Sequence, residues 1–169
     1  MTTRRAHVVR RAVAGDEKAL TRLRAQMLAD MGRLNEGSDP RWHGVTEEWF
    51  ARRLRDEEDF AAFVIEDPDL GIVSCAVGIC DDHAPTPGNL SGMHGNVSNM
   101  STDPRFRRLG YARACLEALL AWFRDETPAM WVKLNATEDG IALYRSLGFT
   151  EPGNPALQLK LDKLDNDLR

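Results

Sequence analysis

The stretch from residue 99 to residue 116, NMSTDPRFRRLGYARACL, decides how this chain is organised. Its polar start predicts a strand that ends at Thr102, because Pro104 lacks a backbone donor and biases the preceding residue toward an extended conformation. A basic turn follows, and Gly110 then opens a helix. The apolar positions of that helix recur every three or four residues and make one face: Ala112, Leu116, Leu119, Leu120 and Phe123.

The start of this helix has the chemistry of an anion site. A helix N-terminus carries roughly half a positive charge and several unpaired N–H groups. Gly110 allows a bulky group to approach the backbone closely, and it is surrounded by the arginines Arg105, Arg107, Arg108 and Arg113. The pattern predicts a cradle for a diphosphate, and the alternative is a basic helix start that binds no ligand.

Two motifs in this chain resemble one enzyme family. Arg107-x-x-Gly110-x-Ala112 is similar to the R/Q-x-x-G-x-G/A signature of the GCN5-related N-acetyltransferases, which hold the pyrophosphate of acetyl-CoA there. The segment 143–149, LYRSLGF, resembles the LY-x-x-LGF segment of the same family. The resemblance implies one acetyltransferase domain over residues 1–169, acetyl-CoA as co-substrate and no metal.

Composition narrows the class of protein. A chain of 169 residues with 43% hydrophobic and 28% charged residues fits one globular domain. A net charge of −4 argues against a nucleic-acid binder. The absence of an apolar signal segment or spanning run predicts a cytoplasmic protein without membrane association. The cysteines lack metal-ligand spacing and are expected in the core: Cys75, Cys80 and Cys115.

The order of elements predicts the fold class. Strands are expected at residues 7–11, 60–66, 72–80, 96–102, 130–134 and 156–161. Helices are expected at residues 16–31, from a cap at Thr46 onward, at 110–126 and at 139–147. The order β-α-α-β-β-β-α-β-α-β is that of the acyl-CoA N-acyltransferase fold, an α/β (α+β) mixed sheet whose central strands splay apart.

Local patterns predict how some strands pair. The turn residues 67–71, DPDLG, predict an antiparallel hairpin between the second and third strands. The strand 130–134 follows a helix, so a right-handed crossover places it parallel to the strand 96–102, where it should be buried. Residues 81–95 are expected to form a long loop, which in a compact domain is usually functional or disordered.

The resemblance assigns cofactor contacts to this sequence. Main-chain groups of Met100 and Thr102 would bind pantetheine like an added strand. The diphosphate would lie against the loop and helix start, formed by Arg107, Arg108, Leu109, Gly110, Tyr111, Ala112 and Arg113. Asn135 follows the strand 130–134 and either contacts the cofactor or forms a turn.

Tyr144 matches the position where the family commonly has a general acid. A phenol with a pKa near 10 stays protonated at neutral pH and can donate its proton to a departing thiolate. The alternative is an amphipathic core residue on the helix 139–147.

No carboxylate lies on the strand 96–102 that could act directly as the general base. The open choices are a water relayed by Asn96 or Ser98, no base at all, or a group from the neighbouring segments: His94, His83, Asp81, Asp82, Glu47 or Glu48.

The sequence says least about the acceptor. Residues 32–58 and 81–95 are acidic, which favours a cationic amine, and Trp42 and Trp49 either line a pocket or pack in the core. A small-molecule amine is favoured because the 81–95 loop is long enough to cover a pocket. A peptide or lysine amine is the alternative within the enzyme class, and a non-catalytic acyl-CoA-binding module the alternative outside it. Assembly as a homodimer stays open.

Overall fold

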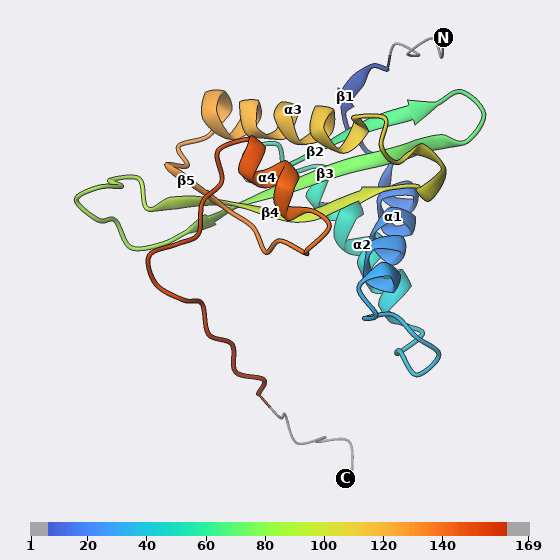
Figure 1. Ribbon diagram of the computed structural model, residues 1–169, viewed down its shortest axis with the longest axis horizontal. Helices are drawn as coiled ribbons and strands as arrows, with labels where there is room; N and C mark the ends of the chain where they lie inside the picture. The colour runs from blue at the N-terminus through green and yellow to red at the C-terminus, as the bar shows by residue number, and fades with distance from the viewer. Residues whose placement is uncertain (1–6, 162–169) are drawn as a thin grey trace. The chain divides into compact units, whose positions relative to one another are not determined.

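The computed structural model describes residues 7–161, and the chain forms two compact units, residues 1–135 and 136–169. The first unit contains a five-stranded sheet of order β1-β2-β3-β4-β5 (Figure 1). Its strands are β1 (Val9–Arg11), β2 (Phe60–Asp67), β3 (Gly71–Asp82), β4 (Met93–Thr102) and β5 (Trp131–Lys133). Its helices are α1 (Glu17–Asp30), α2 (Trp42–Arg53), the 3-10 turn η1 (Pro104–Phe106) and α3 (Tyr111–Glu126).

Neighbouring strands of the sheet are antiparallel except for the last pair. The β2–β3 hairpin is confirmed, and its turn is closed by the Asp67 carboxylate, which accepts from the N–H groups of Asp69 and Leu70. β5 pairs with β4 in the parallel sense, as a right-handed crossover through α3 requires. The expected mixed sheet is therefore confirmed.

One face of the sheet is covered by α1 and α2, and the other by α3 (Figure 1). Leu20 and Leu23 of α1 and Phe50 of α2 pack with Val64 and Val77 of the sheet in one apolar core, as the helical spacing predicts. Trp49 packs edge-on against Phe50 and Phe60, so it belongs to this core.

The opposite face is flat enough for α3 to approach closely. A Cβ on Gly78 would lie 2.7 Å from Leu119, and one on Gly95 would lie 2.6 Å from Phe123. Both glycines therefore let α3 pack directly on the backbone of β3 and β4. Leu116, Leu119 and Phe123 are buried as predicted, together with Cys115 and Trp122.

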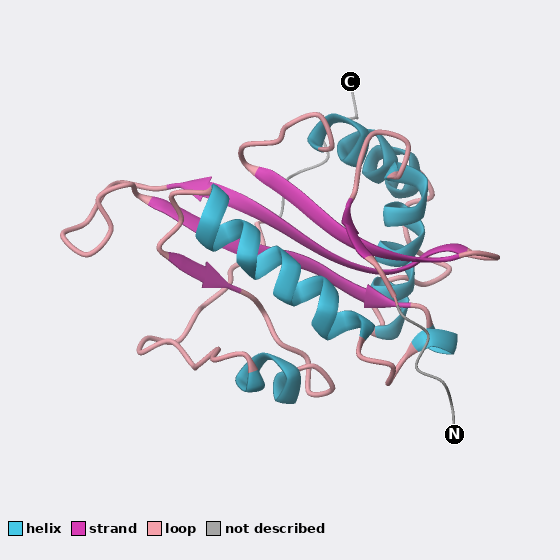
Figure 2. Ribbon diagram, turned by 90° about the horizontal axis from the view of Figure 1, so that it is seen from above, coloured by secondary structure: helices cyan, strands magenta, loops and turns pink. Residues whose placement is uncertain are grey.

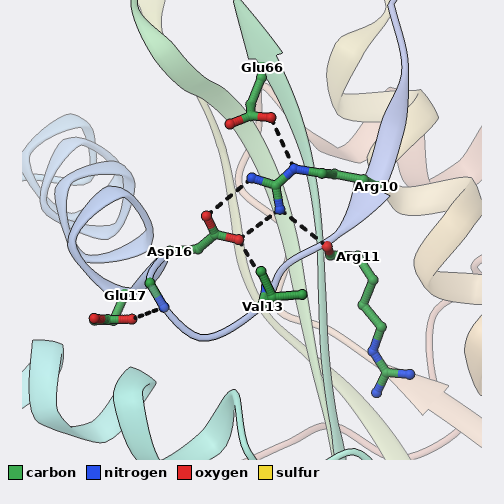
Figure 3. A network of polar contacts seen from close by, with 7 residues as sticks. Arg10, Arg11, Val13, Asp16, Glu17 and Glu66 are labelled. Carbon is green, nitrogen blue, oxygen red and sulfur yellow. Dashed lines mark hydrogen bonds and ion pairs between the residues drawn. The ribbon is translucent and has the colours of Figure 1, made fainter.

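An ion-pair network ties the start of α1 to the sheet. Arg10 on β1 binds the carboxylates of both Asp16 (2.7 Å) and Glu66 (3.0 Å), as Figure 3 shows. Asp16 also accepts from the Val13 N–H at 2.8 Å. These contacts fix the direction in which α1 leaves β1.

Several element boundaries differ from the expectation. α2 already begins at Trp42, so Thr46 lies inside the helix and the predicted cap is wrong. β3 and β4 extend to residues 82 and 93, because antiparallel pairing continues past their apolar parts. The predicted 81–95 loop therefore shortens to residues 83–92. Its tip is closed by two hydrogen bonds between the backbones of Thr86 and Asn89.

β5 is an exposed edge strand and the prediction that it is buried is wrong. It pairs only with β4, so its other edge has no neighbour within residues 7–161. Trp131 and the adjacent Met130 are each 63% exposed.

The second unit contains α4 (Ile141–Ser146), as the sequence predicts. The predicted strand at residues 156–161 is wrong: this segment pairs with no described strand. Alternation alone cannot make a strand without a partner for its backbone groups. Its alternating leucines are exposed: Leu157, Leu159 and Leu161.

Candidate active site

The candidate site begins where β4 loses its partner on one side. β5 pairs with residues 94–96 of β4 and ends there. Figure 2 shows this short strand at the edge of the sheet. Beyond Asn96, β4 continues to Thr102 with β3 on one edge and no strand from residues 7–161 on the other. The segment 97–102 therefore presents backbone N–H and C=O groups that an extended ligand can bind like an added strand. Met100 and Thr102 both lie on this free edge.

A β-bulge lies on the same segment. Val77 of β3 is opposite Asn99, whereas Gly78 is opposite Val97, so Ser98 is the extra residue, with no residue of β3 opposite it in the register. The extra residue bends the strand and interrupts its ladder of hydrogen bonds. β4 is thus irregular immediately after its pairing with β5 ends.

The turn after β4 is held by Asp103. Asp103 is 7% exposed, and its carboxylate accepts from the backbone N–H of Arg105 (3.0 Å) and from the guanidinium of Arg105. These hydrogen bonds lower the pKa of Asp103 to about 2, so it stays ionised at neutral pH. Pro104 follows in the first position of η1, where its missing N–H has no consequence.

The backbone conformation before α3 is unusual. Arg108 has φ = 63° and Gly110 has φ = 85°, both in the left-handed region. Glycine adopts this conformation freely. A residue with a side chain adopts it at a cost of order 1–3 kcal/mol, and such strained residues are typical of ligand sites. Gly110 is the N-cap of α3, so no side chain caps the first turn, which also contains no acidic residue. The helix therefore offers free N–H groups to an anion.

The arginines around Gly110 are partly neutralised by carboxylates. Arg107 binds Asp30 at the end of α1 (2.6 Å) and also donates from Nε to the Thr102 carbonyl (3.1 Å). A carbonyl oxygen has two lone pairs, so Thr102 keeps one for a ligand.

Two further arginines are also in ion pairs, Arg105 with Asp103 and Arg113 with Glu117. Arg108 is exposed and pairs with no carboxylate in the described part of the chain. Leu109 is 48% exposed, and Tyr111 packs its ring against Phe106.

Tyr144, the predicted acid, lies on α4 in the second unit. Its side chain is buried, its ring contacts Phe149 edge-on, and burial raises the pKa of its phenol. The group therefore holds its proton throughout the neutral range. Asn135 is exposed at the end of the first unit, two residues after β5.

Four of the candidate base residues come together at the ends of β3 and β4. The ring centroids of His83 and His94 are 4.4 Å apart, and Asn96 donates to the carboxylate of Asp81. His94 lies directly opposite Asp81 in the strand register. His94 therefore lies on β4 and not in the loop that the sequence predicts at residues 81–95.

His94 has the properties of a neutral imidazole. Its Nδ1 atom is buried and has no hydrogen-bond partner in the structure. Partial burial, together with the charge of Lys133 and the neighbouring His83, lowers the pKa of His94. Glu47 and Glu48 lie on α2 rather than in this group.

The sequence was compared with protein families. The family model described as acetyltransferase (GNAT) domain matches residues 58–151, more than half of the chain. The chain belongs to this family. The match includes β4, the turn and the start of α3 in the first unit, and α4 with Tyr144 in the second. A comparison with curated proteins finds no match.

Solved structures with the same fold include other GNAT-type proteins. A predicted acetyltransferase from Clostridium acetobutylicum, solved with acetyl-CoA, has a TM-score of 0.80 and 24% identity, with 92% of this chain and 96% of that one covered. A GCN5-related N-acetyltransferase from Ralstonia eutropha JMP134 has a TM-score of 0.73 at 21% identity, covering 91% and 99%. Glucosamine-6-phosphate N-acetyltransferase from Arabidopsis thaliana has a TM-score of 0.67 at 17% identity, with 93% of this chain and 98% of that one covered. These likenesses confirm the GNAT fold.

Residues 7–161 contain no group of three or more potential ligands, His, Cys, Asp or Glu, that could hold a metal ion. None of the helices in this range is long and apolar enough to cross a membrane. The three cysteines are buried and unpaired, as expected, and burial raises the pKa of Cys75 and Cys115 to about 12.

Proposed function

We propose that this GNAT protein transfers the acetyl group of acetyl-CoA to the amine of a small molecule. The observation that carries the proposal is the continuity of two binding surfaces. The free edge of β4, residues 97–102, leads through the Asp103 turn directly to the uncapped N-terminus of α3. An extended amide chain suits the first surface and a diphosphate suits the second, which is the order of these groups in CoA.

The cradle fits a diphosphate on three physical grounds. Gly110 lets the backbone approach closely, the first turn of α3 has no side-chain cap on its N–H groups, and Arg108 is a cation with no carboxylate partner among residues 7–161. Arg107 would either stay on Asp30 or turn its guanidinium to a phosphate oxygen. Arg113, in the first turn, adds a second nearby cation.

Acetyl-CoA would supply an activated thioester, so that an amide C–N bond forms and the C–S bond breaks. The protein must then accept one proton from the amine and give one to the sulfur. We assign the second proton to Tyr144, whose raised phenol pKa keeps it protonated. A pure acyl-CoA-binding module needs no acid at this position, so Tyr144 favours an enzyme.

For the proton taken from the amine, we propose His94. It lies on β4, the strand with the free edge, and its lowered pKa leaves it unprotonated at neutral pH. It lies four residues before the bulge at Ser98, and both Asn96 and His94 pair with the terminal part of β3. A water held by Asn96 and Asp81 is the alternative relay.

The test is release of CoA thiol from acetyl-CoA on a panel of small amines and on peptides with free N-terminal or lysine amines. Turnover of small amines with little turnover of peptides is the expected result. Preference for peptides would move the acceptor to the protein class. Acetyl-CoA binding without thiol release on any amine would indicate a non-catalytic module.

A further inference from the structure

Arg24 occupies a position on α1 where the helical pattern calls for an apolar side chain. It lies one helical turn after Leu20 and directly follows Leu23, both of which are completely buried against the sheet. Arg24 itself is partly buried. A charged residue on the inner face of a helix is informative, because burying a cation is costly unless an anion is close.

The described residues provide no such anion. The Nη1 atom of Arg24 reaches only the side-chain oxygen of Asn99, at 3.5 Å, which is longer than an ordinary hydrogen bond. The nearby Cys75 thiol is neutral, because burial raises its pKa to about 12. Burial accordingly lowers the pKa of Arg24, as expected for a guanidinium whose charge is not balanced.

Arg10 at the other end of α1 shows the contrast. Its guanidinium has carboxylates on both sides, Asp16 and Glu66, and ties structural elements together (Figure 3). Arg24 forms no ion pair with any of residues 7–161 and so links no structural elements in this way. Its charge is therefore available for an anion other than the carboxylates of residues 7–161.

Arg24 lies beside the bulge of β4 and away from the diphosphate cradle, so the anion it would bind belongs to the acceptor. Asn99 is 2% exposed and directly follows Ser98, the bulged residue of β4. Asn99 is opposite Val77, whose side chain belongs to the core beneath α1 and α2. Arg24 therefore lies beside the bulge on the face away from α3, whereas the diphosphate cradle is at the start of α3.

We propose that Arg24 binds a carboxylate of the acceptor, so that the substrate is an amine that carries a carboxylate, as an amino acid does. This inference rests on the proposed function. A carboxylate matches the planar fork of a guanidinium and balances one positive charge with one negative charge. A phosphate dianion would leave an excess negative charge in the same half-buried place.

The test uses matched acceptor pairs that differ only in this group: α-amino acids and the corresponding α-amino amides. Thiol release from acetyl-CoA is measured for the wild type, Arg24→Gln, Arg24→Lys and Lys18→Gln. The last is a control, because Lys18 is an exposed residue of the same helix and its loss removes the same charge. Calorimetric titration with acetyl-CoA and thermal unfolding are recorded for each protein.

The wild type and Lys18→Gln are expected to prefer at least one amino acid over its amide by about tenfold or more in kcat/KM. Arg24→Gln should lose this preference through slower turnover of the acid, with the amide changed less than about twofold, and Arg24→Lys should keep part of it. Unfolding temperature and acetyl-CoA affinity should stay near the wild-type values.

The proposal is overturned if amides are used as well as acids in every pair, if no carboxylate-bearing amine is acetylated, or if Arg24→Gln keeps the preference. Turnover of neutral amines alone would refute the role of Arg24 and leave the proposed function intact. If the wild-type protein neither binds acetyl-CoA nor acetylates any amine, the proposed function and the role of Arg24 are both refuted.

Discussion

Replacing Gly110 by Asp tests the diphosphate cradle most directly. Gly110 is the N-cap of α3, and its carbonyl accepts the first helical hydrogen bond, from Ala114 at 3.0 Å. An Asp side chain here would place a carboxylate over the free N–H groups of the first turn. Asp is a favoured N-cap residue, although φ = 85° at this position strains any side chain. We therefore expect the variant to fold.

The size of the effect follows from Coulomb's law. Two unit charges about 5 Å apart repel by about 3 kcal/mol at an effective dielectric constant of about 20. Salt at physiological strength, with a Debye length of about 8 Å, reduces this to roughly 1.5–2 kcal/mol. Acetyl-CoA affinity should then fall by about ten- to thirtyfold.

The matched control is Gly110→Asn, which has the same shape and backbone strain and no charge. Asn also tolerates the left-handed conformation better than most residues. Calorimetric titration with acetyl-CoA at low and high salt measures both variants, and circular dichroism checks α3. We expect a much smaller loss for Asn than for Asp, with the difference shrinking at high salt. Equal affinities for the Asp and Asn variants would refute a charge-based cradle at this helix start.

Three further variants test the remaining assignments. Tyr144→Phe should lower kcat by at least about tenfold while acetyl-CoA binding changes by no more than about 1.5 kcal/mol, and a wild-type kcat with chemistry rate-limiting would leave Tyr144 a packing residue. His94→Gln should lower kcat/KM by about a hundredfold. It should also remove the acidic limb of the pH profile of kcat/KM, which lies below pH 6.5 because the pKa of His94 is lowered. An unchanged pH profile would exclude His94 as the base. Shortening the loop between Ala84 and Leu90 should change the KM of the acceptor, and a parallel change in the KM of acetyl-CoA would assign the loop to the cofactor site or the fold.

Local sequence signals predicted much of the chain, because they report on contacts between residues close in sequence. The Pro104 break, the Gly110 helix start and the spacing of Leu116, Leu119 and Phe123 are such signals, and each is found in the structure. The turn 67–71 likewise predicted its hairpin. The family followed from the short motifs around Gly110 and Tyr144, since their chemistry is carried by consecutive residues.

Long-range pairing decided what these signals could not. The bulge at Ser98 depends on the register between β3 and β4, and the strand position of His94 depends on β3 continuing to Asp82. Conversely, the alternating leucines predicted a strand at residues 156–161, but this segment pairs with no described strand. A strand requires hydrogen-bond partners, and its own sequence does not specify them.

The candidate site shows the same division. The sequence determined which groups could bind a diphosphate, because a glycine, arginines and a helix start lie within a few residues of each other. Only the tertiary structure decided that Arg107 is paired with Asp30, 77 positions away, and that Arg24 meets Asn99, 75 positions away, without a carboxylate. Charges balance according to distance in space, so an ion pair or its absence is settled only when helices and strands pack.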